Sequence, residues 1–250
     1  MTDPLVARLQ LFEPLSEVEI EALTSLTERV IAYDKHRDLL QQGDSLNHLY
    51  LMRQGWACRY TILPGGKRQI ISFVIPGDLC NDHVLLFHRM EHSIATLTPC
   101  ELGVISPHRF LQVLAAHPRI TRGLYWSGFV MEAVLRERIV SLGRRTATQR
   151  IAHLFCELLL RLRAAGLAHD HSFDLPLTQL DIADTLGLNH VHVNRVIRTM
   201  RKLGLIRLKR HVLEIPNWDD LTALGEFDPR HLNGFVGHTD QATAPRDRLP

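Results

Sequence analysis

The sequence lacks the marks of several large protein classes. It has only four cysteines in 250 residues and no C-x-x-C pair, which excludes the usual zinc-knuckle pattern and gives no disulfide framework. The longest apolar stretch, around LFCELLL, is far shorter than the roughly 20 residues that span a bilayer, and the opening MTDPLVARLQ has no signal-peptide core. We therefore expect a soluble, cytoplasmic protein with no membrane partner and with four reduced, buried thiols.

An excess of charge is also missing, because 29 Lys and Arg residues face 27 Asp and Glu residues and the formal net charge is +2. Composition alone therefore gives no indication of whether the protein binds nucleic acid. Fifteen histidines are present, but no G-x-S-x-G, P-loop or H-E-x-x-H motif accompanies them. Isolated Asp-His neighbours are common by chance, so we expect no enzymatic activity.

The first part of the chain, residues 1–116, has the pattern of an all-β roll. Short β-like runs such as HLYLMRQG and KRQIISFVIPGD lie between glycines, with the spacing that is typical of jelly rolls and barrels. Pro64-Gly65-Gly66 has the chemistry of a hairpin turn, and Ser16 with Glu19 forms a possible capping box in front of the roll. We predict a double-stranded β-helix of the jelly-roll type.

Residues 117–143 change to a helical period without an interrupting proline, and they carry an apolar stripe. An ordinary helix packed on its own domain fits the same periodicity. We favour a dimerisation helix, because a single long helix between two domains has few cores of its own and a symmetric dimer commonly covers such a stripe. The candidate dimerisation residues are Leu124, Met131, Leu135, Ile139 and Leu142.

Residues 144–217 fit a winged helix-turn-helix domain. The segment TATQRIAHLFCELLLRLRAAG is predicted to be an amphipathic helix ended by glycine. In the next segment, Thr178 and Asp181 form a capping box. Gly187 supplies the positive φ of a tight turn, and Asn189 is the natural N-cap of a second helix. Two short β runs in LGLIRLKRHVLEIP then supply the wing, which completes an α+β fold.

Residues 218–250 form a C-terminal extension. One short helical piece, WDDLTALGEF, leads into a polar segment without apolar periodicity. We expect this extension to be largely disordered after about residue 236.

The stretch HVHVNR after Asn189 looks at first like a metal-binding strand. On a helix, however, His190 and His192 are about 200° apart and cannot bind one ion together. With Val193 and Val196 facing inward, the outward face carries the polar and basic side chains that read bases in the major groove. The alternative to DNA binding is a protein-interaction module, in which the same basic face binds an acidic protein. The candidate DNA-binding residues are Thr178, Gln179, Asn189, His190, Val191, His192, Asn194, Arg195, Arg198, Lys202, Lys209 and Arg210.

This order of parts resembles the Crp/Fnr family of bacterial transcription regulators. The resemblance covers roughly residues 10–216 and is most specific in LPLTQLDIADTLGLNHVHVNRVIRTMRKLGLI and in the run from HLYLMRQG to VIPGDL. It implies a homodimer that binds a near-palindromic site on double-stranded DNA and senses a small effector through the roll. An activator of this kind would also contact RNA polymerase.

The chain departs from the family at its sensory positions. His92-Ser93 stands where cyclic-nucleotide members have Arg-Ser, and without that arginine a cyclic phosphate loses its charged partner. We therefore do not expect cyclic AMP as the effector. The iron–sulfur members need an N-terminal cysteine cluster, whereas the first cysteine here is Cys58. Cys80 and His83 follow Gly-Asp, as in the haem-based carbon-monoxide sensor but with different spacing, so haem, metal or redox sensing is an alternative.

No cofactor is therefore assigned with certainty, and the effector is an unknown small molecule or signal. The same polar residues of the roll could equally be satisfied side chains of the core. The candidate effector-binding residues are Cys80, Asp82, His83, His92 and Ser93. In the recognition helix only Arg195 matches the family pattern, so the preferred DNA half-site need not be the usual one.

Overall fold

The computed structural model describes residues 3–87 and 89–232. The expectation of disorder after about residue 236 therefore concerns a segment outside the described residues. None of the helices within the described ranges is long and apolar enough to cross a membrane.

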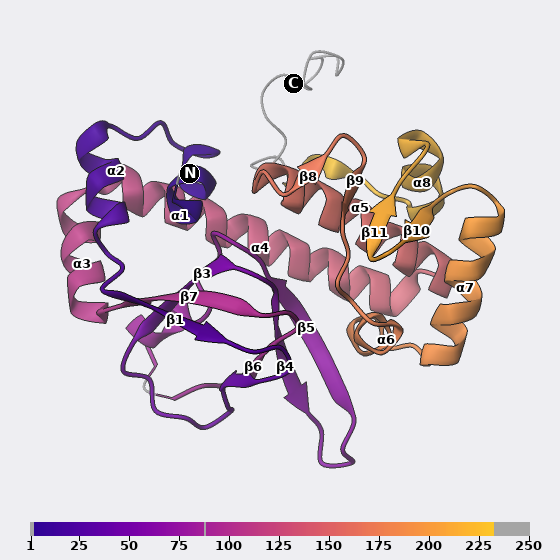
Figure 1. The fold of residues 1–250 in the computed structure, drawn as a ribbon, viewed down its shortest axis with the longest axis horizontal. Helices are drawn as coiled ribbons and strands as arrows, with labels where there is room; N and C mark the ends of the chain where they lie inside the picture. The colour runs from indigo at the N-terminus through magenta and orange to yellow at the C-terminus, as the bar shows by residue number, and fades with distance from the viewer. Residues whose placement is uncertain (1–2, 88, 233–250) are drawn as a thin grey trace, which may run out of the picture.

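The N-terminal part is a β-roll built from two antiparallel sheets, as predicted (Figure 1). One sheet has the order β1-β7-β3 and the other the order β2-β6-β4-β5. The strands are β1 (Arg29–Tyr33), β2 (Asp38–Leu40), β3 (Leu49–Gln54), β4 (Ala57–Ile62), β5 (Arg68–Val74), β6 (Ser93–Thr96) and β7 (Cys100–Ile105).

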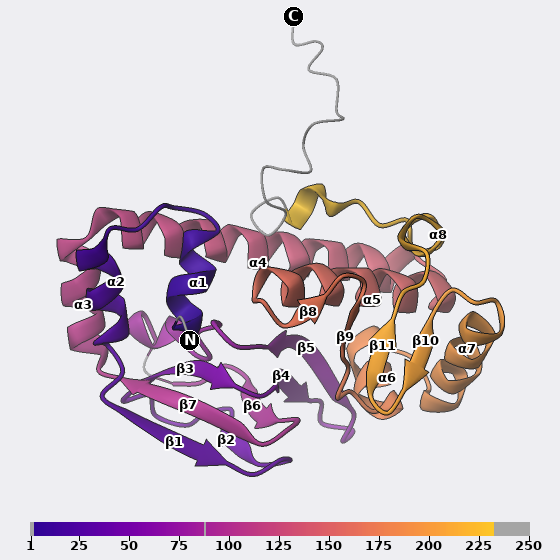
Figure 2. The same ribbon diagram turned by 45° about the horizontal axis from the view of Figure 1, so that its top comes forward.

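Short helices close one end of the roll, next to the long helix α4 (Figure 2). Ser16 and Glu19 form the predicted capping box at the start of α2. Leucines of α1 and α2 share a buried cluster with residues of β3 and β7. These helices are α1 (Pro4–Gln10), α2 (Glu17–Thr24) and α3 (Pro107–Ala116), and the 3-10 helix η1 (Asp82–Leu85) contacts β3.

The long helix α4 (Pro118–Arg144) runs along the molecule and joins its two halves (Figure 1). The next helix, α5 (Ala147–Ala164), begins with a capping box formed by Thr146 and Gln149. The predicted amphipathic helix is present, but its polar side chains are buried as well: every residue from 151 to 162 is buried. The reason is its central position: α5 packs against α4, the helix-turn-helix and α8, and Arg161 reaches the roll.

The C-terminal part contains the helix-turn-helix and a small sheet with the order β10-β11-β9-β8. The last two strands are the predicted wing, whereas β8 and β9 form an additional hairpin that the sequence pattern did not indicate. The elements are β8 (Ala168–His169), β9 (Ser172–Asp174), α6 (Gln179–Leu186), α7 (His190–Lys202), β10 (Arg207–Lys209), β11 (Val212–Glu214), α8 (Trp218–Gly225) and the 3-10 helix η2 (Pro229–Leu232).

The two halves are held together by polar contacts as well as by a shared apolar core. At the start of β5, the Arg68 guanidinium donates to Asp184 from Nε and to Asp181 from Nη2, each at 2.7 Å. The side chain of Gln69 donates to the carbonyl of Thr185 at 3.2 Å. Arg68 and Gln69 therefore attach the roll to α6, the first helix of the helix-turn-helix.

Candidate nucleic-acid interface

The turn between α6 and α7 has the geometry that its residues predict. The Thr178 hydroxyl accepts from the Asp181 amide at 3.1 Å, and the Asp181 carboxylate accepts from the Thr178 amide at 3.0 Å. Gly187 ends α6 with φ 61° and ψ 38°, in the left-handed region that glycine adopts without strain. The Asn189 side chain then accepts from the Val191 amide at 2.8 Å and starts α7.

Helix α7 buries one face and leaves the opposite face open. Val193, Val196, Ile197 and Met200 are buried against α5 and α6. Val191 is 65% exposed, which is unusual for an apolar side chain at the first turn of a helix. The predicted inward and outward faces are therefore correct. Figure 1 shows α7 at the end of the molecule that is farthest from α2 and α3.

The side chains on the open face are positioned by one another and by Gln179, and within the described residues their hydrogen bonds involve no carboxylate. Asn194 donates to Oε1 of Gln179 at 2.8 Å and accepts from Nη2 of Arg198 at 3.1 Å. Arg195 lies against Nδ1 of His192 at 2.6 Å. Because these arginines contact an amide and an imidazole and not a carboxylate, their charge remains available to a phosphate or a base edge. The link from Gln179 to Asn194 connects the two helices and could not be anticipated from spacing.

His190 and His192 lie at the start of α7, where His190 is exposed and His192 is half-buried against its neighbours. Within residues 3–87 and 89–232, no group of three or more His, Cys, Asp and Glu side chains is arranged to hold a metal ion.

The wing adds cationic side chains beside α7. Arg210 and His211 have φ values of 50° and 65°, so they form the tight two-residue turn between β10 and β11. Lys209 and Arg210 are exposed. Arg207, in contrast, donates to Glu214 at 2.7 Å across the hairpin. The run from 195 to 210 contains no acidic residue in sequence. The fold nevertheless brings the Glu214 carboxylate to Arg207, so the charge of Arg207 is partly balanced within the hairpin.

The structure brings two of the five candidate effector residues close together. The rings of His83 and His92 are 5.2 Å apart between centroids. Cys80 is buried, Asp82 projects from η1 and is largely exposed, and the Ser93 hydroxyl accepts from the Gln42 amide at 3.0 Å. These three side chains therefore do not converge with the histidines on one point.

Two residues of this region were missed by the sequence analysis. Met90 lies with its sulfur 3.3 Å from Nε2 of His83. Arg59 of β4 donates to the carbonyls of Leu79 and Cys80 at 2.6 and 3.2 Å. An arginine so engaged with the backbone is not a replacement for the phosphate-binding arginine of cyclic-nucleotide binders.

Burial controls the protonation of this region. It lowers the pKa of His92 to about 4, with a further contribution from the nearby charge of Arg59. It also lowers the pKa of His83, against the opposing effect of Asp82. Burial raises the pKa of the Cys80 thiol to about 12. Both imidazoles and the thiol are therefore neutral at neutral pH.

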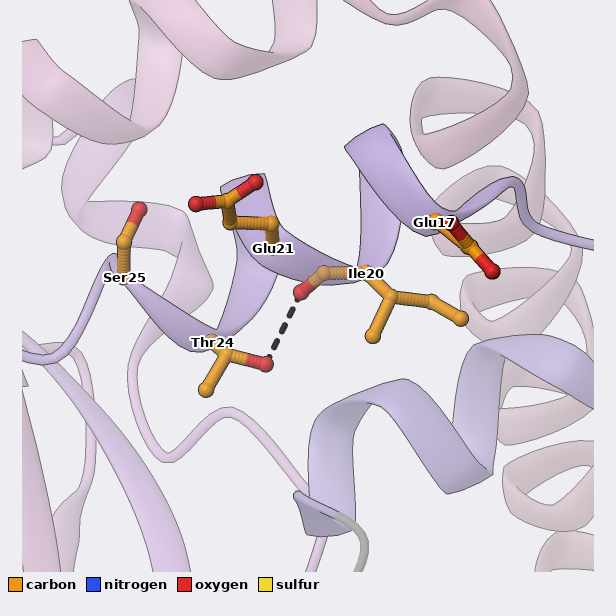
Figure 3. Close-up of a pocket in the computed structure, with 5 residues that line it drawn as sticks. All are labelled: Glu17, Ile20, Glu21, Thr24 and Ser25. Atoms are coloured by element: carbon orange, nitrogen blue, oxygen red, sulfur yellow. Dashed lines mark hydrogen bonds between the residues drawn. The ribbon is translucent and has the colours of Figure 1, made fainter.

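A hollow on the molecular surface lies along α2, away from these residues (Figure 3). Glu17, Glu21, Ile20 and Ser25 line it, together with Thr24, whose hydroxyl donates to the Ile20 carbonyl at 2.8 Å. Its carboxylates are exposed, and it contains none of the candidate effector residues. We do not associate it with the sensory function.

The predicted dimerisation stripe on α4 is only partly exposed. Leu135 and Ile139 are 38% and 71% exposed. Leu124, however, packs on the core of the roll, and Leu142 lies close to Gly187 of the helix-turn-helix, so these two side chains serve contacts within the chain. The periodicity could not distinguish the two faces, because both are apolar.

An aromatic cluster was missed on the open face of α4. Tyr125 and Phe129 pack edge to face with their ring centroids 4.5 Å apart, and Trp126 lies 6.1 Å from Phe129. All three side chains are largely exposed, as is Val140 further along the helix. The open apolar face of α4 therefore consists of Tyr125, Trp126, Phe129, Leu135, Ile139 and Val140.

A β-roll joined by a long helix to a winged helix-turn-helix with exposed basic residues is the architecture of a DNA-binding transcription regulator. Two family models match the chain: a cyclic nucleotide-binding domain over residues 30–117 and a Crp-like helix-turn-helix domain over residues 149–224. The chain belongs to the Crp/Fnr family of transcription regulators.

Individual relatives support this assignment. The chain is 30% identical over 222 residues to the anaerobic regulatory protein of Haemophilus influenzae, covering 85% of this chain and 81% of the relative. It is 29% identical over 223 residues to the regulatory protein HlyX of Actinobacillus pleuropneumoniae, covering 87% and 90%. The solved structure of FixK2 from Bradyrhizobium japonicum has the same fold, with a TM-score of 0.69 at 21% identity over 78% of this chain and 96% of that one.

Proposed function

We propose that this Crp/Fnr regulator binds DNA as a homodimer, with α7 of each subunit in the major groove of one half-site. The observation that supports this most directly is the open face of α7, where Asn194, Arg195 and Arg198 are held by an amide, an imidazole and one another, and not by a carboxylate. Arginine can make a bidentate contact with guanine and asparagine one with adenine, while Val191 can meet a thymine methyl group.

The remaining candidates have supporting roles in this proposal. Thr178, Gln179 and Asn189 lie at the starts of α6 and α7, where free amides and short polar side chains suit phosphate contacts. His190, His192, Lys202, Lys209 and Arg210 flank the reading residues and contribute to phosphate or base-edge contacts.

A homodimer is supported by the open apolar face of α4, which carries three aromatic side chains next to one another. Two copies related by a twofold axis would cover this face and place their α7 helices on half-sites about one helical turn apart, roughly 34 Å. The β-roll then senses a small effector other than cyclic AMP. If the protein activates transcription, it also contacts RNA polymerase, and we place its action in the cytoplasm, where the DNA is.

Selection of bound genomic fragments, followed by binding measurements on the selected site, tests this proposal. We expect the affinity to fall steeply with salt and Arg195→Ala to lose discrimination at one base pair by about 1–3 kcal/mol. Arg109→Ala is the matched control, because Arg109 is an exposed arginine on α3, at the opposite end of the molecule. Full sequence preference in Arg195→Ala would remove the assignment of the reading residue, and the absence of any selected site would refute DNA reading.

A further inference from the structure

The loop between β5 and β6 brings two histidines and a methionine together inside the roll. His83 belongs to η1, whereas Met90 and His92 lie just before β6. Nε2 of His83 is 3.3 Å from Sδ of Met90, and the two imidazole rings are 5.2 Å apart. Met90 and His92 are both buried, and His83 is half-buried.

Each imidazole has the carboxylate of the preceding residue near its Nδ1. Nδ1 of His83 lies 3.9 Å from a carboxylate oxygen of Asp82, and Nδ1 of His92 lies 3.6 Å from one of Glu91. In metal sites a ligating histidine commonly turns its second nitrogen to a carboxylate, which fixes the ring and leaves the other nitrogen for the metal. Here Nε2 is the nitrogen that lies away from the carboxylate in both residues, and in His83 it contacts the sulfur of Met90.

Nε2 of His92 is also unsatisfied. It is fully buried and has no hydrogen-bond partner among residues 3–87 and 89–232. A buried polar atom without a partner costs about 1–3 kcal/mol, so it calls for a specific reason. A bound metal ion would satisfy this nitrogen and would also be within reach of Nε2 of His83 and the sulfur of Met90, which already face each other.

The type of ligand decides the metal. A thioether is a soft donor, which favours Cu(I), whereas magnesium and calcium prefer oxygen ligands. Zinc is commonly held by four Cys, His or carboxylate ligands, and no group of three such side chains is arranged for a metal in the part of the chain that the structure describes. We propose that His83, Met90 and His92 form a Cu(I) site in the β-roll.

A role of Cu(I) as the effector rests on the function proposed above. The binding of the ion to the roll does not depend on that function. Binding would link η1 to the start of β6. In the same roll, Arg68 of β5 is hydrogen-bonded to α6. The site thus lies on an element that is connected to the DNA-binding half.

Anaerobic competition for Cu(I) against bathocuproine disulfonate, with the full chain, tests the site without DNA. We expect the wild type to withdraw one equivalent of Cu(I), and Met90→Leu and His83→Gln each to weaken binding at least about tenfold. Met52→Leu is the matched control, since it removes a buried thioether from the same roll. X-ray absorption of the loaded wild type should show two nitrogen ligands and one sulfur ligand, with the sulfur lost in Met90→Leu.

Three results would overturn the site: no Cu(I) uptake by the wild type, unchanged affinity in Met90→Leu, or affinity lost in Cys80→Ser while Met90→Leu retains it. Tighter binding of Zn(II) than of Cu(I) would overturn the choice of metal. Thermal melts of the apo variants verify that they fold. Site-specific DNA affinity with and without Cu(I) then tests the effector role: an unchanged affinity refutes it, whereas the absence of DNA binding refutes the proposed function and leaves the metal site standing.

Discussion

A buried network of charges joins the two halves of the molecule, and it allows a quantitative prediction. Glu157 of α5 accepts from Nη2 of Arg138 at 2.9 Å and lies 3.5 Å from Nη1 of Arg161. Arg161 also donates to Asp78 at 3.2 Å, and Arg8 forms an ion pair with Asp78. All five side chains are at most 8% exposed, so these charges are poorly solvated.

The balance of charge decides which substitution is worse. Three arginines face two carboxylates, so Glu157→Gln leaves three buried cations with one anion. Removing one partner of a buried ion pair costs about 3–5 kcal/mol. Arg161→Met leaves two separate neutral pairs, Arg8 with Asp78 and Arg138 with Glu157. It also removes the Arg161 contacts with Asp78 and Glu157, but each carboxylate keeps one arginine. The hydrogen bond to the buried Phe73 carbonyl is lost without replacement, at a cost of about 1–3 kcal/mol.

Urea unfolding at pH 7 and one fixed protein concentration measures this order. Burial by itself would raise the pKa of Glu157, but Arg138 and Arg161 outweigh burial and lower it, so the carboxylate is ionised at this pH. With a slope of about 1–3 kcal/mol/M, we expect Glu157→Gln to lower the midpoint by about 1 M or more and Arg161→Met by less. If Arg161→Met is as destabilising as Glu157→Gln, the charge accounting is refuted.

Two further predictions concern the contacts between domains and between subunits. Arg68→Met removes both hydrogen bonds from the roll to Asp181 and Asp184. We therefore expect the amides of α6 to exchange hydrogen about tenfold faster or more, while the amides of β1 and β7 keep their protection. Unchanged exchange in α6 would contradict the role of this contact. Leu135→Asp places a charge on the open face of α4 and should shift the protein to monomers in sedimentation velocity, whereas Leu111→Asp, an exposed leucine on α3, should not. A wild type that sediments as a monomer at every concentration would refute the dimer.

The local features of the DNA-binding half could be predicted because each depends on neighbours within a few residues. The capping box of Thr178 and Asp181, the left-handed Gly187 and the N-cap Asn189 are all present as expected. The inward and outward faces of α7 follow from the helical period alone. These short-range rules, together with the order of the parts, were sufficient to indicate the family.

Contacts between distant segments could not be predicted in this way. The sequence places no acid near Arg207, yet the β10–β11 hairpin pairs it with Glu214. Leu124 and Leu142 have the same spacing as exposed residues of α4, but Leu124 packs on the core of the roll and Leu142 lies close to Gly187. In each case the deciding factor is which surface lies opposite, and periodicity carries no information about that surface.

The sequence by itself determined the class of protein, because caps, turns and helical faces are set by the chain's local chemistry. Only the tertiary structure decided how the halves are coupled and which polar side chains of the roll meet. It buried α5 on all sides with Arg161 in its charge network. It also placed Met90 against His83 beside His92. Such arrangements depend on the packing of segments far apart in the chain, where burial, and not spacing, selects which polar groups meet.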